Sequence, residues 1–251
     1  MLKTRIIPVL LLRNEALVKT INFNNASYIG DPINTVRIFN ELEVDELVFL
    51  DIYATIEKRS PNLKVLFEIS NECFMPLGYG GGLNDFDTVK SIFSIGFEKV
   101  ILNSITHSQP SFVTRVAEHF GNQAVMASID VKKNFWGKYE VYSRSKQLNT
   151  KKDPVNWAME LEDLGAGEII LTSIDKEGTW SGFDIELIKK VTDSVNIPVI
   201  AHGGAGQLQH IHDVVNKGGA SAVGLGSMVV YQKKGMGVLV NFPDKQQLEN
   251  Q

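Results

Sequence analysis

The chain has 251 residues, 43% hydrophobic and 22% charged, which is typical of one globular domain near the usual size of an eight-unit barrel. A net charge of −4 argues against nucleic-acid binding through a basic face, and the lone cysteine, Cys73, excludes an internal disulfide framework. No apolar run reaches the roughly 18 residues that span a bilayer, and no signal peptide is recognisable, so we expect a cytoplasmic protein without a membrane segment.

Short apolar runs rich in β-branched residues recur along the chain and alternate with segments of helical periodicity. Such runs lack strict polar alternation, which is typical of strands buried on both faces. We expect strands at residues 6–12, 46–52, 74–77, 99–102, 124–129, 168–172, 197–201 and 222–225. We expect helices at residues 32–42, 85–95, 110–120, 154–164, 184–195 and 207–217, four of them followed by a capping glycine at Gly96, Gly121, Gly165 or Gly218.

This alternation predicts parallel βα units, and eight units in this length favour a single closed (β/α)8 TIM barrel over an open doubly wound sheet. An internal repeat divides the barrel into two half-barrels, at about residues 1–120 and 121–251. Residues 46–52 recur as 168–174, and Gly81-Gly82 recur at the same offset as Gly203-Gly204. No linker composition separates the halves, so we expect one domain over residues 1–251.

Glycines and small polar residues follow the predicted strands at equivalent places in both halves. They are Gly81, Gly82, Asn103 and Ser104 in the first half, and Gly203, Gly204, Gly226 and Ser227 in the second. Glycine lets backbone N–H groups approach an anion closely, and a following helix N-terminus favours negative charge. Two such phosphate cradles at one barrel mouth predict an elongated ligand with a phosphate at each end. The alternative is that the glycines only form tight turns.

Asp130 ends the fifth predicted strand, where barrels present catalytic residues, so it is a candidate general acid or base. Alternatively, Asp130 caps the next segment. Its counterpart in the repeat is Leu11, which cannot transfer a proton, so a facing pair of carboxylates is missing. Asp175 and Glu177 either contact a ligand or belong to a solvated loop, and Asp51 is either functional or paired with a cation.

Four charged residues stand at the starts of predicted strands and are expected to meet at the amino-terminal end of the barrel: Arg5, Glu46, Lys99 and Glu168. By itself, this pattern favours a stabilising plug of salt bridges. His202 ends the seventh predicted strand beside the second cradle and is a candidate to face the site. The spacing of His210 and His212 does not place them on one helix face, so we expect no metal site.

Together these motifs resemble the HisF family, the cyclase subunits of imidazole glycerol phosphate synthase. The resemblance covers about residues 3–230, and its motifs are RIIP at 5–8, DELVFLDI at 45–52, GGG at 80–82, GAGEIILTSID at 165–175 and GGAG at 203–206. It implies duplicated half-barrels, a HisH-like glutaminase docked at the amino-terminal face, and ammonia that passes through the barrel to a small ligand with two phosphates. The products would be imidazole glycerol phosphate and an aminoimidazole carboxamide ribotide. We expect no cofactor and no metal.

The resemblance also implies residue roles. Asp130 matches a catalytic acid or base, and Lys19 matches a residue of a loop that covers the substrate. The four charged residues at the strand starts, Arg5, Glu46, Lys99 and Glu168, match the family's ammonia gate. Phosphate contacts are implied at Gly82, Asn103, Ser104, Gly178, Gly203, Gly204, Gly226 and Ser227, and we place Gly81 and Glu177 with them.

The chain departs from the family at four places, one of which is the loop after the first strand, residues 12–16, which lacks the usual Asp-Gly. Leu11 stands where the first strand normally ends in the other catalytic aspartate, Glu177 replaces an aspartate, and little chain remains after residue 238 for a full eighth helix. These departures resemble a paralogous branch from surface-polysaccharide loci. Those proteins act with a HisH-like glutaminase and a sugar amidotransferase to convert an acetamido group into an acetamidino group. The alternatives are a working cyclase of histidine biosynthesis, a lyase that uses Asp130 and Glu177, and a non-catalytic scaffold that activates the glutaminase.

Overall fold

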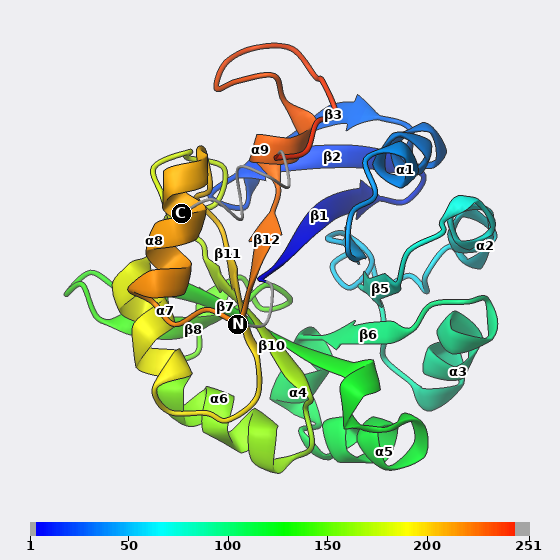
Figure 1. Cartoon of the computed structure of the whole chain (residues 1–251). Helices are drawn as coiled ribbons and strands as arrows, with labels where there is room; N and C mark the ends of the chain where they lie inside the picture. Colours follow the sequence, from blue (N-terminus) through cyan, green and yellow to red (C-terminus); the bar gives the residue numbers. More distant parts are fainter. Residues whose placement is uncertain (1–3, 244–251) are drawn as a thin grey trace.

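The computed structural model describes residues 4–243. Eight parallel strands form a closed barrel: β1 (Arg5–Arg13), β4 (Leu47–Asp51), β5 (Leu77–Gly80), β6 (Lys99–Leu102), β7 (Val125–Lys133), β10 (Glu168–Ser173), β11 (Val199–His202) and β12 (Ala222–Leu225). Closure is complete because β12 pairs with β1 and β10 pairs with β7 (Figure 1). The predicted TIM barrel is therefore confirmed, and the doubly wound alternative is wrong. The division into half-barrels remains a prediction.

Helices surround the strands: α1 (Pro32–Glu41), α2 (Leu63–Glu72), α3 (Phe86–Ser94), α5 (Ser111–Phe120), α6 (Pro154–Asp163), α7 (Ile185–Thr192) and α8 (Leu208–Asn216). The aspartate before α1, α3, α6 or α7 accepts a hydrogen bond from a first-turn N–H group, which explains where those helices begin. Single-turn segments are α4 (Ser104–Ser108), η1 (Asn122–Ala124) and α9 (Ser227–Val230). No helix within residues 4–243 is long and apolar enough to cross a membrane.

Some predicted elements are wrong. The third barrel strand is Leu77–Gly80 and not 74–77. The apolar residues before it end in Pro76, and Phe74 is 87% exposed, so they do not belong to the buried strand. Helix α2 was not predicted. The capping glycine after α8 is Gly219, with φ of 73°, and not Gly218. After α9 the chain does not form an eighth helix within the described residues, and Tyr231 instead bridges Val238 in an antiparallel contact.

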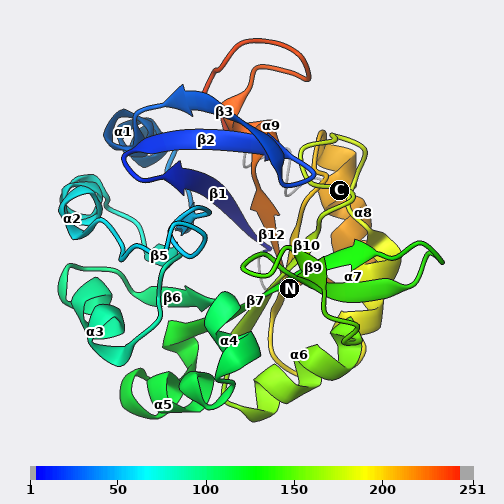
Figure 2. The ribbon, with the colours of Figure 1, turned by 180° about the vertical axis from the view of Figure 1, so that it is seen from behind.

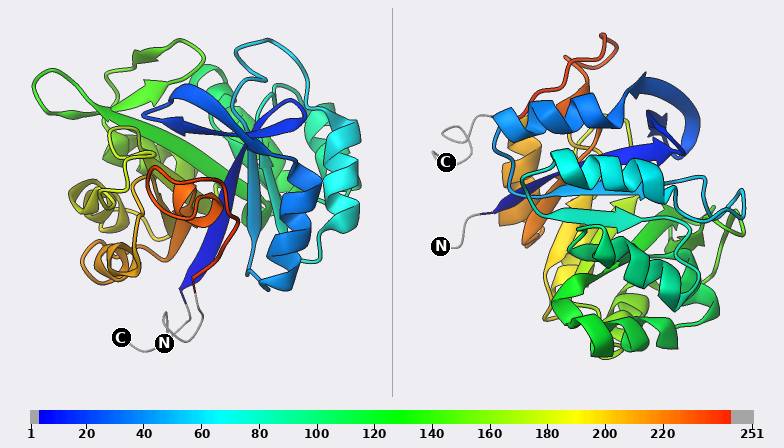
Figure 3. Two further views of the ribbon diagram at one scale, coloured as in Figure 1. Left: turned by 90° about the horizontal axis from the view of Figure 1, so that it is seen from above. Right: turned by 90° about the vertical axis from the view of Figure 1, so that its right-hand side faces the viewer.

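Two antiparallel hairpins extend the barrel at its carboxyl end, and the sequence analysis predicted neither. The first consists of β2 (Ala16–Ile21) and β3 (Asn24–Gly30), with β2 paired to the end of β1. The second continues β7 into β8 (Tyr139–Ser143), which then pairs with the short β9 (Leu148–Asn149). Figure 2 shows both in front of the barrel, and Figure 3 places them at the end opposite to the start of β1.

The hydrophobic core has two parts. The larger cluster lies between the barrel and its helices. The smaller cluster fills the barrel interior and consists of Ile7, Val9, Val48, Ile101, Met126, Ile170, Ile200 and Ala222, with Leu50 packed against it. Apolar side chains therefore separate the charged residues at the strand starts from the polar residues at the strand ends.

Candidate functional site

Three adjoining cavities run across the carboxyl end of the barrel. The central cavity encloses about 810 Å³, including space open to solvent, and is flanked by cavities of about 250 and 360 Å³. Asn103 and Ser104 line both the central cavity and the first flanking cavity, while Leu11, Glu177 and His202 line both the central cavity and the second. The three together form an elongated site with one predicted phosphate cradle at each end.

The first cradle contains Gly81, Gly82, Asn103 and Ser104, and the second contains Gly178, Gly203, Gly204, Gly226 and Ser227. The paired glycines have positive φ in both cradles, 122° and 67° in the first and 90° and 112° in the second. A Cβ atom at Gly203 would lie 2.8 Å from the carbonyl oxygen of Ser173, so only glycine fits there. Helices α4 and α9 begin at Ser104 and Ser227 without side-chain caps, which leaves their first N–H groups available to an anion.

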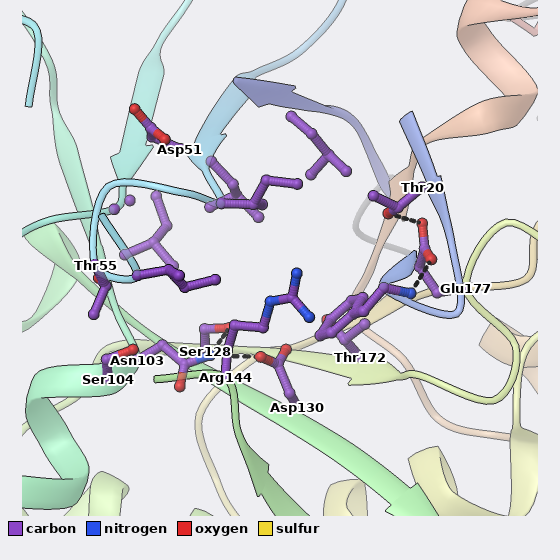
Figure 4. Close-up of a pocket in the computed structure, with 18 of the residues that line it drawn as sticks. Thr20, Asp51, Thr55, Asn103, Ser104, Ser128, Asp130, Arg144, Thr172 and Glu177 are labelled. Atoms are coloured by element: carbon purple, nitrogen blue, oxygen red, sulfur yellow. Dashed lines mark hydrogen bonds between the residues drawn. The ribbon is translucent and has the colours of Figure 1, made fainter. Parts of the chain in front are cut away.

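Asp130 lies in β7, which continues to Lys133 instead of ending at Asp130 as predicted, and it lines the central cavity (Figure 4). Its carboxylate accepts a hydrogen bond from Asn103 Nδ2 at 2.8 Å. Burial raises the pKa of Asp130 to about 6, and the Asn103 hydrogen bond and the charge of Arg144 partly offset that rise. A carboxyl group with this pKa exchanges protons near neutral pH, which suits a general acid or base.

Leu11 lies on the wall of the same cavity, 6% exposed. The wall also includes Leu50, Ile52 and Ile101. Leu11, the predicted counterpart of Asp130 in the repeat, therefore contributes an apolar surface to the site.

The β2–β3 hairpin closes over the second cradle through Glu177. The Glu177 carboxylate accepts hydrogen bonds from Thr20 Oγ1 at 2.9 Å and from the backbone N–H of Phe23 at 3.0 Å. At Gly178, φ is 72° and a Cβ atom would lie 2.5 Å from the carbonyl oxygen of Thr20, so a side chain would push the hairpin away. Burial raises the pKa of Glu177. Glu177 thus holds the hairpin.

Lys19 points inward from the same hairpin and is 4% exposed. Its Nζ donates a hydrogen bond to the carbonyl oxygen of Val9 at 2.8 Å, and it lines the second flanking cavity. Burial lowers the pKa of Lys19 to about 8, and the charge of Glu177 limits that decrease. The lysine is therefore inside the site and mainly protonated at neutral pH.

The other candidates have different surroundings. His202 faces the site, its Nδ1 lies 3.0 Å from Thr172 Oγ1, and burial lowers its pKa to about 3.

Asp51 is buried beside Arg59, with 2.7 Å between their charged atoms, and accepts hydrogen bonds from the N–H groups after β4. Asp175 accepts a hydrogen bond from the N–H of Lys133 at 2.9 Å and supports the second hairpin, away from the cavities.

Sequence reasoning missed Arg144, which reaches the site from the β8–β9 turn. Its guanidinium points into the central cavity in Figure 4 and lies 5.8 Å above the ring of Phe23. The only signal for it was the high density of basic residues at 132–152. No group of three His, Cys, Asp or Glu residues within 4–243 is arranged to hold a metal ion.

At the amino end of the barrel, the four predicted charges form a closed network, which we call the charged ring: Arg5, Glu46, Lys99 and Glu168. Arg5 contacts Glu46 and Glu168 at 2.9 Å each, and Lys99 contacts the same two carboxylates at 3.0 and 3.2 Å. Each cation therefore bridges both anions, and the ring covers the apolar interior of the barrel.

Comparisons with known proteins agree with this architecture. A family model described as "Histidine biosynthesis protein" matches residues 5–235. A Pseudomonas aeruginosa protein provisionally named imidazole glycerol phosphate synthase subunit hisF2 is 44% identical over 99% of both chains. A Leptospira borgpetersenii protein, provisionally named as the HisF subunit, is 45% identical over 97% of this chain and 96% of its own. A Nostoc imidazole glycerol phosphate synthase subunit HisF is 37% identical over 99% of this chain and 97% of its own. This chain therefore belongs to the HisF family of imidazole glycerol phosphate synthase subunits.

Proposed function

We propose that this chain receives ammonia from a HisH-like glutaminase at its amino face and delivers it through the barrel for amidation of a surface-polysaccharide sugar. The acceptor would be an acetamido group that a separate sugar amidotransferase converts into an acetamidino group. The chemistry uses glutamine as the nitrogen source, and we place it in the cytoplasm. The observation that carries this proposal is Leu11 on the wall of the site. The chain nevertheless has both cradles at that site and the charged ring at the other end of the barrel.

The barrel interior supports a role in ammonia transfer. The interior cluster between the charged ring and the site consists of aliphatic side chains and Met126. An apolar passage favours neutral ammonia over ammonium, because burying an unpaired cation is costly. The ion pairs of the charged ring must separate for ammonia to enter, so we assign the ring the role of a gate.

A carboxylate facing Asp130 would normally share proton transfer with it, and Leu11 cannot do so. Loss of one positioned acid or base typically costs about 10²–10⁴-fold in rate. Glu177 does not compensate in this arrangement, since its two oxygens hold Thr20 and Phe23 of the hairpin.

The second candidate function is the cyclase reaction of histidine biosynthesis. Asp130, with a pKa raised to about 6, and the two cradles favour it, since they match a ligand with a phosphate at each end. The site residues assigned to phosphate are Gly81, Gly82, Asn103, Ser104, Glu177, Gly178, Gly203, Gly204, Gly226 and Ser227. A third possibility, a scaffold that only activates the glutaminase, does not require an apolar interior beneath a charged ring.

The deciding experiment measures cyclase turnover of the purified chain with the bisphosphate ligand and excess ammonium, which removes the need for a glutaminase. Leu11→Asp is assayed in parallel. We expect no turnover by the unmodified chain and measurable turnover by Leu11→Asp. Turnover by the unmodified chain would instead establish the cyclase and overturn the amidation proposal. An Arg5→Ala variant that leaves glutamine-driven amidation unchanged would contradict the gate.

A further inference from the structure

The second hairpin carries an unusual surface at its turn. Phe135 and Trp136 are 93% and 86% exposed, and their rings contact mainly each other, edge to face, with centroids 5.4 Å apart. We call this pair the aromatic tip. Large aromatic side chains contribute most to stability when buried, so an exposed adjacent pair is typical of a contact surface.

Side-chain hydrogen bonds of Asn134 hold the turn that presents the aromatic tip in one conformation. Asn134 Oδ1 accepts hydrogen bonds from the N–H groups of Trp136 and Lys138 at 2.9 and 3.0 Å. Asn134 Nδ2 donates to Glu140 at 2.7 Å, across the base of the turn. An ordered turn loses little conformational entropy on binding, which favours a specific contact.

The surroundings of the tip are strongly basic although the whole chain is acidic. Seven of the 25 Lys and Arg residues lie within residues 132–152, against one acidic residue, Glu140. Lys132, Lys133 and Lys138 flank the tip and are exposed, and of these Lys133 lies 4.0 Å from the carboxylate of Asp184 before α7. Residues 132–152 have a formal charge of +6, against −10 for the rest of the chain, so positive charge is concentrated in this segment. A complementary partner therefore presents an apolar pocket within an acidic surface.

The same hairpin forms part of the site mouth. Its β7 strand carries Asp130, and Arg144 beyond β8 points into the central cavity. Arg144 also lies above Phe23 of the first hairpin, next to Ile21, which is 54% exposed. A partner bound to the tip would thus lie at the same end of the barrel as the opening through which ammonia leaves (Figure 3). Figure 3 shows the second hairpin projecting at this end of the barrel.

We propose that the aromatic tip and its flanking lysines are the docking surface for the acceptor enzyme, an acidic sugar amidotransferase that uses the ammonia released at the carboxyl face. Such docking presupposes the ammonia delivery proposed above. Ammonia that leaves the barrel into open water is protonated and diluted, so an acceptor enzyme gains by covering the mouth. Neither a membrane nor a nucleic acid would use the released ammonia.

The test compares Phe135→Ser combined with Trp136→Ser against Phe67→Ser, an exposed phenylalanine on the outer face of α2. The affinity of each variant, bound to its glutaminase, is measured for the sugar amidotransferase of the same organism. Aromatic anchors at interface centres dominate binding, so we expect at least about 30-fold weaker affinity for the tip variant and no change for the control. Glutamine-driven amidation falls in parallel, whereas glutaminase activity and amidation driven by excess ammonium stay unchanged.

A charge variant tests the acidic partner independently. The double variant Lys132→Glu and Lys138→Glu is compared with the double variant Lys64→Glu and Lys217→Glu. The second pair changes the same number of exposed lysines, but in α2 and at the end of α8. We expect slower association only for the hairpin variant, and a smaller effect of salt on that association. Equal effects from both pairs would show that overall charge, and not the hairpin, governs binding.

The remaining outcomes separate the two proposals. If the unmodified complex supports glutamine-driven amidation and the tip variant binds the amidotransferase equally well, the docking surface is overturned and ammonia delivery stands. If the unmodified complex supports no amidation, ammonia delivery fails and docking fails with it. If the tip variant instead loses binding to vesicles containing phosphatidylglycerol, with unchanged amidotransferase affinity, the surface is a membrane contact and docking is overturned.

Discussion

The two ends of the barrel interior use the same kinds of charged side chains in opposite ways. At the amino end, Glu46 and Glu168 each contact both Arg5 and Lys99. At the carboxyl end, Asp130 is buried and hydrogen-bonded to the neutral amide of Asn103. A buried charge with partners of opposite sign is stabilised, whereas one without them has its pKa shifted toward neutrality. We therefore expect substitutions at the two ends to change stability in opposite directions.

The largest effect is expected from breaking the charged ring. In Glu46→Ala, Arg5 and Lys99 each lose a carboxylate at about 3 Å while Glu168 remains. Breaking a buried ion pair costs about 3–5 kcal/mol, and partial exposure of Arg5 and Lys99 brings our expectation to about 3 kcal/mol. Denaturant unfolding at pH 7 measures the change. A loss below about 1 kcal/mol would mean that water screens the ring as it screens a surface pair.

At the other end, Asp130→Asn is expected to stabilise the protein above pH 6. The folded pKa of about 6 lies above the ordinary value of 3.8, so ionising Asp130 costs stability as pH rises through that interval. The gain approaches about 3 kcal/mol above pH 6, at about 1.4 kcal/mol per pKa unit, and disappears below pH 4. Unfolding curves at pH 4 and pH 7.5 measure it, with exposed Asp87→Asn as the control. A gain that does not depend on pH would contradict this cause.

Lys19→Met is expected to stabilise the chain by a smaller amount, about 1–2 kcal/mol at pH 7. The folded pKa of about 8 lies below 10.5, so the buried cation costs stability at neutral pH, while loss of the hydrogen bond to Val9 offsets part of the gain. Wild-type stability rises between pH 8 and 10.5, so the advantage of Met shrinks over that range. Parallel unfolding at pH 7 and 10 tests this, and an advantage that grows with pH would refute it.

The smallest effect is expected at the surface. Arg37 and Glu72 form a bidentate pair with hydrogen bonds of 2.8 and 2.9 Å, yet both side chains are exposed. Water screens such a pair, so Arg37→Ala should leave the thermal midpoint unchanged within error at physiological salt. A shift comparable to that of Glu46→Ala would show that burial is not what distinguishes the ring from the surface.

Most of the barrel could be predicted from the chain because its strands are apolar runs bounded by turns. The predicted bounds of β10 and β12 agree with the structure to within one residue. The two hairpins were missed for a physical reason. Basic and small polar residues surround the short alternating run of β8, and Lys19 and Thr20 interrupt the apolar pattern after β1, so neither hairpin contains an apolar run like those of the barrel strands.

The candidate site divides in the same way. The glycines, Asp130 and Leu11 were recognisable because they follow strands at equivalent places in a repeat. The role of Glu177 in holding the first hairpin was not, because its partners Thr20 and Phe23 are more than 150 residues away in the chain. Arg144 was missed because its segment resembles an ordinary solvated loop.

By itself, the sequence determined the number and order of the eight barrel strands, most of the residues at their ends, and the replacement of an acid by Leu11. Local periodicity and turn chemistry specify these features without long-range contacts. Only the tertiary structure decided that each cation of the charged ring pairs with both carboxylates, that the first hairpin closes on Glu177, and that burial raises the pKa of Asp130 to about 6. Those properties depend on closure of the barrel, which brings distant residues together and removes water from around them.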